Sequence, residues 1–169
     1  NQFVNAVDTW IPLHVWDACN DPLDVAALEG QVCYAGLDMS SRVDLTALTL
    51  AFEIKQSGGR FKAALYSCAW IPSENVYRKE RADQAPYGQW IQEYPQRVFA
   101  TEGNEVDHDA VLDTIDHLRQ RFKIKSLGFD LWNIGHIADR VRKMGITPLE
   151  FGQGYKSMSV PTKAFYGLA

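Results

Sequence analysis

The sequence predicts an α/β domain with a mixed central sheet and helices packed against it. Three observations predict this class. Residues 31–71 hold three strand-like runs separated by turn residues, residues 72–105 show no clear period, and residues 107–151 alternate helical and strand patterns. An antiparallel meander followed by α-β-α-β units gives a mixed sheet with flanking helices.

The first predicted strand covers residues 32–38 and ends in an acid. It is a short apolar run that stops at Asp38 and is followed by Ser40 and Ser41. Because apolar strands lie inside a sheet, the acid at the end of such a strand lies at the edge where ligands bind.

The second and third strands follow after short connections. Residues 45–54 alternate between two sets, Leu48, Leu50, Phe52 and Ile54 on one side and Ala47, Thr49, Ala51 and Glu53 on the other. A Gln-Ser-Gly-Gly turn at residues 56–59 leads to a third strand at 60–71.

Residues 72–105 are long for a connection inside a compact domain, so we expect them to have a role of their own. We predict short helices at 74–81 and 88–93 and an extended piece at 97–101.

A helix follows, because Val111, Ile115, Leu118 and Phe122 form one apolar stripe. The aspartate at 107 or 109 would be its N-cap. We then predict a strand at 125–132 that carries Asp130 at its end, a helix that stops at Gly145, a strand at 146–151 and the start of another helix.

Composition excludes several classes of protein. The chain has 169 residues, 46% hydrophobic and 22% charged, which is typical of one globular domain and not of a disordered or fibrous protein. No apolar run approaches the ~18–20 residues that cross a bilayer, so we expect no membrane partner. A formal charge of −4 argues against DNA binding by overall charge, although local basic patches remain open.

Two further expectations concern the cysteines and the first residues. Cys19, Cys33 and Cys68 are an odd number without CxxC spacing, so we expect reduced, intracellular thiols and no zinc site. Residues 1–30 show neither period and begin without methionine, which indicates a linker segment at the start of a fragment. The domain itself would cover residues 31–169, C-terminally incomplete.

Asp38 and Asp130 follow the same pattern of an apolar strand that ends in an acid. If the two strands are neighbours, two carboxylates meet in one crevice at the strand ends. Their repulsion is usually relieved by a hard divalent cation, and two such ions can activate a water to attack a phosphodiester. The alternative is that both acids are hydrogen-bonded strand-end residues without a catalytic role.

The arrangement resembles the ribonuclease H-like nuclease fold, and finer features resemble the nuclease domain of the terminase large subunit of tailed bacteriophages. The similar segments, in the order found in that family, are GLDMSSRVDLTAL (36–48), WIPSEN (70–75), APYGQWIQEYP (85–95), TEGNEVDHDAV (101–111), GFDLWNI (128–134) and EFGQGYKSMSVPTKAF (150–165). Each segment is weak evidence alone, whereas six in order are specific.

The resemblance implies that Asp38 and Asp130 are the first and second metal-binding acids. It implies an endonuclease that uses magnesium or manganese at a two-metal site to cut concatemeric double-stranded phage DNA during packaging. It also implies partners, namely the small terminase subunit, the ATPase domain of the full-length chain and the portal protein. The place of action would be the cytoplasm of the bacterial host, and the gene that of a phage or prophage.

This sequence departs from the family pattern in two ways. The family's third acid lies in a C-terminal helix beyond the segment that resembles GQGYKSMSVPTKAF, and this chain ends at Ala169 before such a residue, so we expect an incomplete metal site. The family's ATPase domain is also missing, and no GxxxxGK[ST] loop is present, so this chain should not hydrolyse ATP.

Four more residues have two open interpretations each. Asp44 either orients Arg42 and its turn, which we prefer, or acts as an outer partner of the metal site. Asp107 is either the helix N-cap, which we prefer, or part of that outer shell. His108 and His136 either move protons near the scissile phosphate or are ordinary helix-surface residues.

Among three basic clusters, Arg78, Lys79 and Arg81 form the best candidate for a DNA phosphate contact, because the other two lie at helix C-termini where cations stabilise the helix dipole. A sugar-kinase or actin-like fold also begins with a meander, but it needs glycine after the first acid, which Met39 and the serines do not provide. The remaining alternative is a folded but inactive terminase fragment that only contacts DNA or motor proteins.

Overall fold

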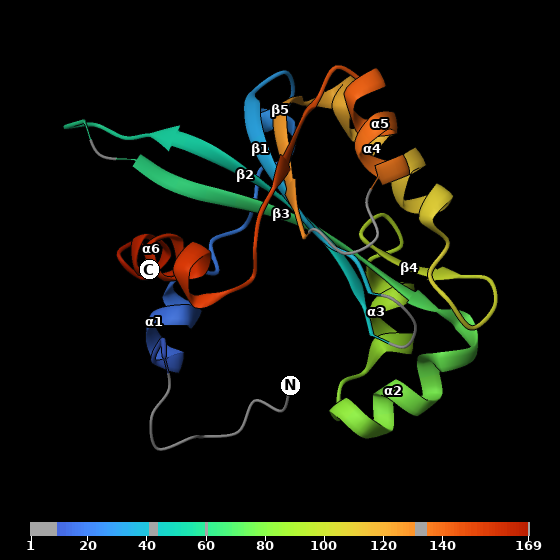
Figure 1. Ribbon diagram of the computed structural model, residues 1–169. Helices are drawn as coiled ribbons and strands as arrows, with labels where there is room; N and C mark the ends of the chain where they lie inside the picture. Colours follow the sequence, from blue (N-terminus) through green and yellow to red (C-terminus); the bar gives the residue numbers. More distant parts are fainter. Residues whose placement is uncertain (1–9, 41–43, 60, 131–134, 169) are drawn as a thin grey trace.

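Six strands form one mixed sheet in the computed structural model, which describes residues 10–40, 44–59, 61–130 and 135–168 and, within these, all side chains except that of His136 (Figure 1). The strands are β1 (Val32–Asp38), β2 (Thr46–Lys55), β3 (Phe61–Pro72), β4 (Val98–Thr101), β5 (Lys123–Phe129) and β6 (Thr147–Glu150). Their order is β4-β3-β2-β1-β5-β6. The predicted meander β1-β2-β3 is antiparallel, and β4, β5 and β6 are each parallel to the neighbour they join.

Alternation in β2 produces one buried and one open face, as the sequence predicts. Leu48, Leu50 and Phe52 are buried, whereas Ala47 and Glu53 on the other face are exposed. Ile54, which the sequence places on the same side as these residues, is 36% exposed, because the far end of the β2–β3 hairpin extends beyond the helices that cover the sheet (Figure 1).

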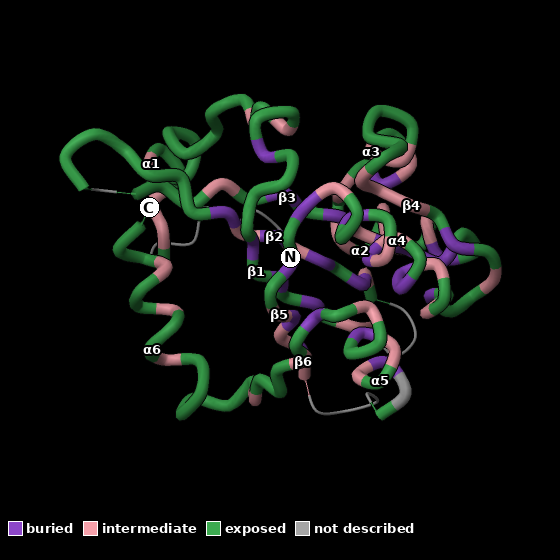
Figure 2. Tube along the Cα trace, turned by 90° about the horizontal axis from the view of Figure 1, so that it is seen from above, coloured by how far each residue is buried: buried purple, intermediate pink, exposed green. Residues whose placement is uncertain are grey.

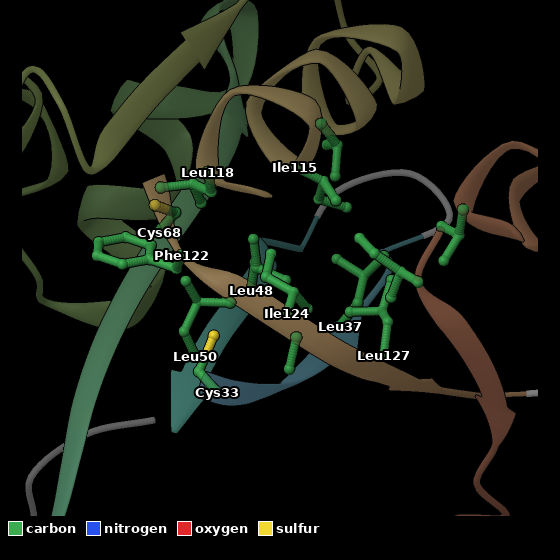
Figure 3. Close-up of a cluster of buried hydrophobic side chains, with 14 of the residues drawn as sticks. Cys33, Leu37, Leu48, Leu50, Cys68, Ile115, Leu118, Phe122, Ile124 and Leu127 are labelled. Carbon is green, nitrogen blue, oxygen red and sulfur yellow. The ribbon is translucent and has the colours of Figure 1, made fainter. Parts of the chain in front are cut away.

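Two helices cover the buried face, α4 (His108–Arg121) and α5 (Gly135–Lys143). Ile115 and Leu118 of α4 belong to the same buried cluster as Leu48 and Ile124 of the sheet, and Figure 3 shows the helix side chains above the sheet side chains. The helix α5 contributes Ile137 and Val141 to the same core, and Gly145 follows it with φ +80°, a conformation that glycine adopts without strain. Burial of these stripes fixes the positions of both helices on the sheet.

The insert between β3 and β4 contains a 3-10 turn, Ser73–Asn75, and two short helices, α2 (Val76–Asp83) and α3 (Tyr87–Glu93). Both predicted helices are therefore present with shifted bounds. The strand β4 then pairs with β3 and adds an edge to the sheet. Tyr87 is buried and packs edge-to-face on Trp90 at 5.3 Å, so aromatic side chains hold the insert together.

The predicted bounds of the strand that precedes Asp130 are wrong by two or three residues. The strand β5 begins at Lys123, directly after α4, because Phe122 fills the core between helix and sheet and Lys123 pairs with Val32. It ends at Phe129, so Asp130 follows the strand instead of lying within it. Residues 131–134 lie outside the described part.

The helices α1 (Leu13–Ala18) and α6 (Tyr155–Tyr166) lie on the other side of the sheet from α4 and α5 (Figure 1 and Figure 2). A 3-10 turn (Ala26–Leu28) connects α1 to β1. Trp10 stacks on Phe165 of α6 at 5.9 Å, and Leu28 is buried in the main core. The division into a linker at 1–30 and a domain at 31–169 stays a prediction.

Cys19 is an exposed free thiol, and Cys33 and Cys68 are buried free thiols. Among the helices that the structure describes, none combines the length and the apolar character needed to cross a bilayer.

Candidate functional site

Asp38 and Asp130 lie at the ends of two adjacent parallel strands. Leu37 of β1 is in register with Phe129 of β5, so the next residues, Asp38 at the end of β1 and Asp130 directly after β5, come to the same edge of the sheet. Neighbouring strands are about 4.8 Å apart, which brings the two backbones close together at this point. The Asp38 side chain is exposed, and Asp130 is half-buried. The condition that the sequence analysis set for a shared crevice, that the two strands are neighbours, is thus met.

Oxygen donors of this kind suit Mg²⁺ or Mn²⁺, which prefer carboxylate ligands. Among the described residues, however, no three His, Cys, Asp or Glu side chains gather closely enough to hold a metal ion. Glu150 ends β6 at the same edge but is in register with Phe129 and not with Asp130. Because residues in register share one face of a sheet, Glu150 lies on the same face as Phe129. Asp38 and Asp130 therefore fit two ligands of a metal site and not a complete set.

The segment that follows Asp38 is tied to the insert by a network of polar contacts. Lys79 of α2 contacts Asp44 Oδ1 at 3.0 Å and Asp83 Oδ2 at 2.9 Å, and the Tyr87 hydroxyl donates to Asp83 Oδ2 at 2.8 Å. Asp83 accepts from both Lys79 and Tyr87, and these bonds lower the pKa of its carboxyl group. The bond to Asp83 raises the pKa of Lys79, and burial raises that of Tyr87 to about 12.

Asp44 thus binds Lys79, a partner that the sequence interpretation did not foresee. Arg42, which we expected Asp44 to orient, lies outside the described residues. Asp83 and Tyr87 also escaped the sequence analysis, although Asp83 lies four residues after Lys79, a spacing that places the two on one side of α2. Tyr87 lies in α3, so no helical spacing connects it to Lys79. The role of Asp44 in the outer shell of a metal stays a prediction.

The preferred interpretation of Asp107 is confirmed, because its carboxylate accepts from the backbone N–H groups of Asp109 (2.8 Å) and Ala110 (3.4 Å) as the N-cap of α4. His108 is the first residue of α4 and half-buried. Since α4 leads directly into β5 and runs back along it, His108 lies near the end of the sheet where β5 ends. His136 lies in α5, and its side chain is outside the described part.

The predicted DNA-contacting residues lie together on α2 but differ in surroundings. Arg78 donates to Asn75 Oδ1 at 2.9 Å, and the Arg81 guanidinium lies 5.8 Å from the centre of the Tyr77 ring. Lys79 has a side chain only 13% exposed, with a carboxylate on each side. A phosphate contact by these three residues stays a prediction, and Lys79 is the least accessible of them.

The sequence of the chain is similar to those of known proteins. The family model described as "Terminase large subunit, endonuclease domain" matches residues 1–169. The chain belongs to this family. It is 34% identical over 161 residues to the "Terminase, large subunit" of Enterobacteria phage HK97, a match that covers 94% of this chain and 30% of the relative. The chain therefore spans about a third of that relative's length.

A solved structure supports the assignment of fold within the terminase family. The crystal structure of the HK97 bacteriophage large terminase superposes with a TM-score of 0.78 at 30% identity, over 95% of this chain and 32% of the other. The six-stranded mixed sheet with flanking helices is ribonuclease H-like, as the sequence predicts. In this terminase nuclease domain the antiparallel meander is joined to parallel strands at β1 and β5, where Asp38 and Asp130 lie.

Proposed function

We propose that this terminase nuclease domain is a metal-dependent endonuclease that cuts concatemeric double-stranded phage DNA during genome packaging. The observation that carries the proposal is the meeting of Asp38 and Asp130 at the ends of adjacent parallel strands, in a chain of the terminase endonuclease family. Strand ends in open α/β sheets are where ligands bind, and two acids in one place favour cations.

In this proposal, Asp38 and Asp130 supply carboxylate oxygens to bind Mg²⁺ or Mn²⁺. A divalent cation bound there would supply the Lewis acidity that activates water and stabilises the leaving oxygen of a phosphodiester. The strand ends hold the carboxylates on a rigid sheet, and the exposed edge at Asp38 leaves access for a DNA backbone. Arg78 and Arg81 are the residues we propose for phosphate contact.

The wider setting is proposed from the relatives. We infer that double-stranded DNA, the small terminase subunit, the ATPase part of a longer chain and the portal protein are the partners, and that cutting takes place in the cytoplasm of the bacterial host, in a phage or prophage context. The support is that the HK97 relative is a terminase large subunit of which this chain matches about a third.

The test combines metal binding with DNA cleavage by the 169-residue chain. Asp38→Asn and Asp130→Asn each remove one charged ligand while keeping the size of the side chain. We expect each to weaken Mn²⁺ binding, measured by electron paramagnetic resonance, and to reduce cleavage of linear double-stranded DNA by about 10³-fold, because a Lewis acid contributes several kcal/mol to such a step. Glu53→Gln, an exposed acid on β2 at the far end of the same sheet, is the matched control and should change neither.

Two results would contradict the proposal. Equal Mn²⁺ affinity in wild type, Asp38→Asn and Asp130→Asn would show that these acids are structural. Metal binding that depends on both acids without any cleavage would favour the second candidate, an inactive domain that only contacts DNA or motor proteins. The lack of a third ligand among the described residues is the observation in favour of that candidate.

A further inference from the structure

We propose that Lys79 is a positioning residue that holds the segment following Asp38 in place through Asp44. The inference rests on the proposed function, because it concerns how the candidate metal ligand Asp38 is held. Its basis is a continuous path of polar contacts from α3, through α2, to the connection between β1 and β2.

At the β1–β2 end, two hydrogen bonds connect the described residues on either side of positions 41–43. The Ser40 N–H donates to Thr46 Oγ1 at 3.1 Å, and the Asp44 N–H donates to Ser40 Oγ at 3.0 Å. Thr46 is completely buried at the start of β2. Ser40 is only two residues after Asp38, so these bonds link the end of β1 to Asp44 and to the start of β2.

At the α2 end, Lys79 is held independently of Asp44. Its ammonium contacts Asp83 Oδ2, whose side chain is 17% exposed, and Asp83 is itself fixed by the hydroxyl of the buried Tyr87. The Asp44 side chain is 81% exposed, so it has little packing of its own. The asymmetry makes Lys79 the fixed partner and Asp44 the residue that is held.

The same contacts argue against Lys79 as a phosphate ligand. A lysine that binds the DNA backbone needs an accessible ammonium, whereas this one is 13% exposed and lies between two carboxylates at 2.9 and 3.0 Å. An ion pair on an exposed surface contributes little to the stability of the fold. Lys79 is partly buried and already held by Asp83, so it loses less side-chain entropy when it also binds Asp44. We therefore assign to Lys79 the role of orienting Asp44, and through Asp44 the residues next to Asp38.

The experiment measures order in the connection separately from metal binding. Amide hydrogen exchange by NMR, without metal, reports on the Asp44 N–H that bonds Ser40. Lys79→Met and Asp44→Asn should each speed exchange of this amide by about fivefold, which is the upper range for an ion pair of this kind. Exchange of this amide in the double variant should be no faster than in either single variant, because both substitutions remove the same contact between Lys79 and Asp44. Lys79→Arg should restore slow exchange.

A second measurement connects this order to the candidate site. Mn²⁺ affinity should fall about tenfold in Lys79→Met and in Asp44→Asn, in the range found when an outer partner of a metal ligand is removed. Lys143→Met, an exposed lysine at the end of α5, is the control and should alter neither exchange nor affinity. Asp44→Asn is exposed and should fold normally, so it keeps the test valid if Lys79→Met does not fold.

The outcomes separate the two proposals. Unchanged exchange at Asp44 in both variants, or fully additive effects in the double variant, would overturn the positioning role of Lys79. If wild-type protein binds no Mn²⁺ while exchange still rises in the variants, the segment is held as proposed and the nuclease assignment fails. Faster exchange with unchanged Mn²⁺ affinity would overturn the claim that this order acts on Asp38.

Discussion

The two faces of the sheet carry different side chains and have different surroundings. On the face covered by α4 and α5, Leu48, Leu50 and Phe52 of β2 are at most 1% exposed. On the opposite face, Tyr34 of β1 and Leu65 of β3 flank Ala51 in one register row and are 57% and 40% exposed. Helices α1 and α6 lie on this open side without covering it (Figure 2).

Because of this difference, the residues that stabilise the fold and the candidate metal ligand Asp38 lie on different faces of the sheet. The core depends on the covered face, to which Leu37 belongs, whereas Asp38, the next residue of β1, belongs to the open face by alternation. A change at Asp38 therefore leaves the packed side chains untouched. A change one residue earlier removes part of the core.

The largest expected effect comes from truncating an aromatic residue on the covered face. Phe52→Ala leaves a cavity beside Phe122, whose ring lies 5.1 Å away, and should lower the free energy of unfolding by about 3–5 kcal/mol. Tyr34→Ala, on the open face of the adjacent strand, should cost less than about 1 kcal/mol, because most of the side chain is already in water. Urea denaturation of both variants measures these changes. Similar losses of unfolding free energy in Phe52→Ala and Tyr34→Ala would show that the open face is covered in solution.

A second expected effect concerns the thiols. Burial raises the pKa of Cys33 and of Cys68 on the covered face to about 11, whereas Cys19 is exposed. Since the thiolate is the reactive form, alkylation of Cys33 and Cys68 at pH 8 should be at least about 100-fold slower than that of Cys19. Mass spectrometry of iodoacetamide-treated native protein measures each site. Labelling of all three at one rate in folded protein would mean that the covered face opens readily.

The smallest expected effect concerns the N-cap of the helix that covers the sheet. Asp107→Ala removes an acceptor for two backbone N–H groups at the start of α4 and should lower the free energy of unfolding by about 1 kcal/mol. Asp113→Ala, an exposed acid within the same helix, should stay within about 0.5 kcal/mol of wild type in the same thermal denaturation series. A larger loss from the Asp113 variant would show that charge on α4, and not capping, is what matters.

Local patterns were sufficient for most of the fold. Alternation at Leu48, Leu50 and Phe52 predicted β2, and the stripe from Val111 to Phe122 predicted α4, because each pattern reflects one buried face. The bounds of β5 could not be predicted in this way. They depend on Phe122 entering the core and on Lys123 pairing with a strand that lies far away in the sequence.

The candidate site was partly predictable for a related reason. The shared strand-end pattern led to Asp38 and Asp130, whereas the sequence analysis could state the pairing of their two strands only as a condition. Lys79 seemed suited to DNA because its charge is visible in the sequence, but its contact with Asp44 arises only when residues 35 positions apart meet in the fold. Spacing along a helix shows one partner, Asp83, and gives no information on the other.

The pairing of β1 with β5 also determines the order in which the site can form. The meander β1-β2-β3 is closed by short connections, so it can form while the later part of the chain is still being synthesised. β5 enters the sheet beside β1 only after the insert, β4 and α4 have been made. A growing chain therefore carries Asp38 for a long interval without Asp130 beside it. The pairing confines any cutting activity that needs both acids to chains that have completed this long-range step of folding.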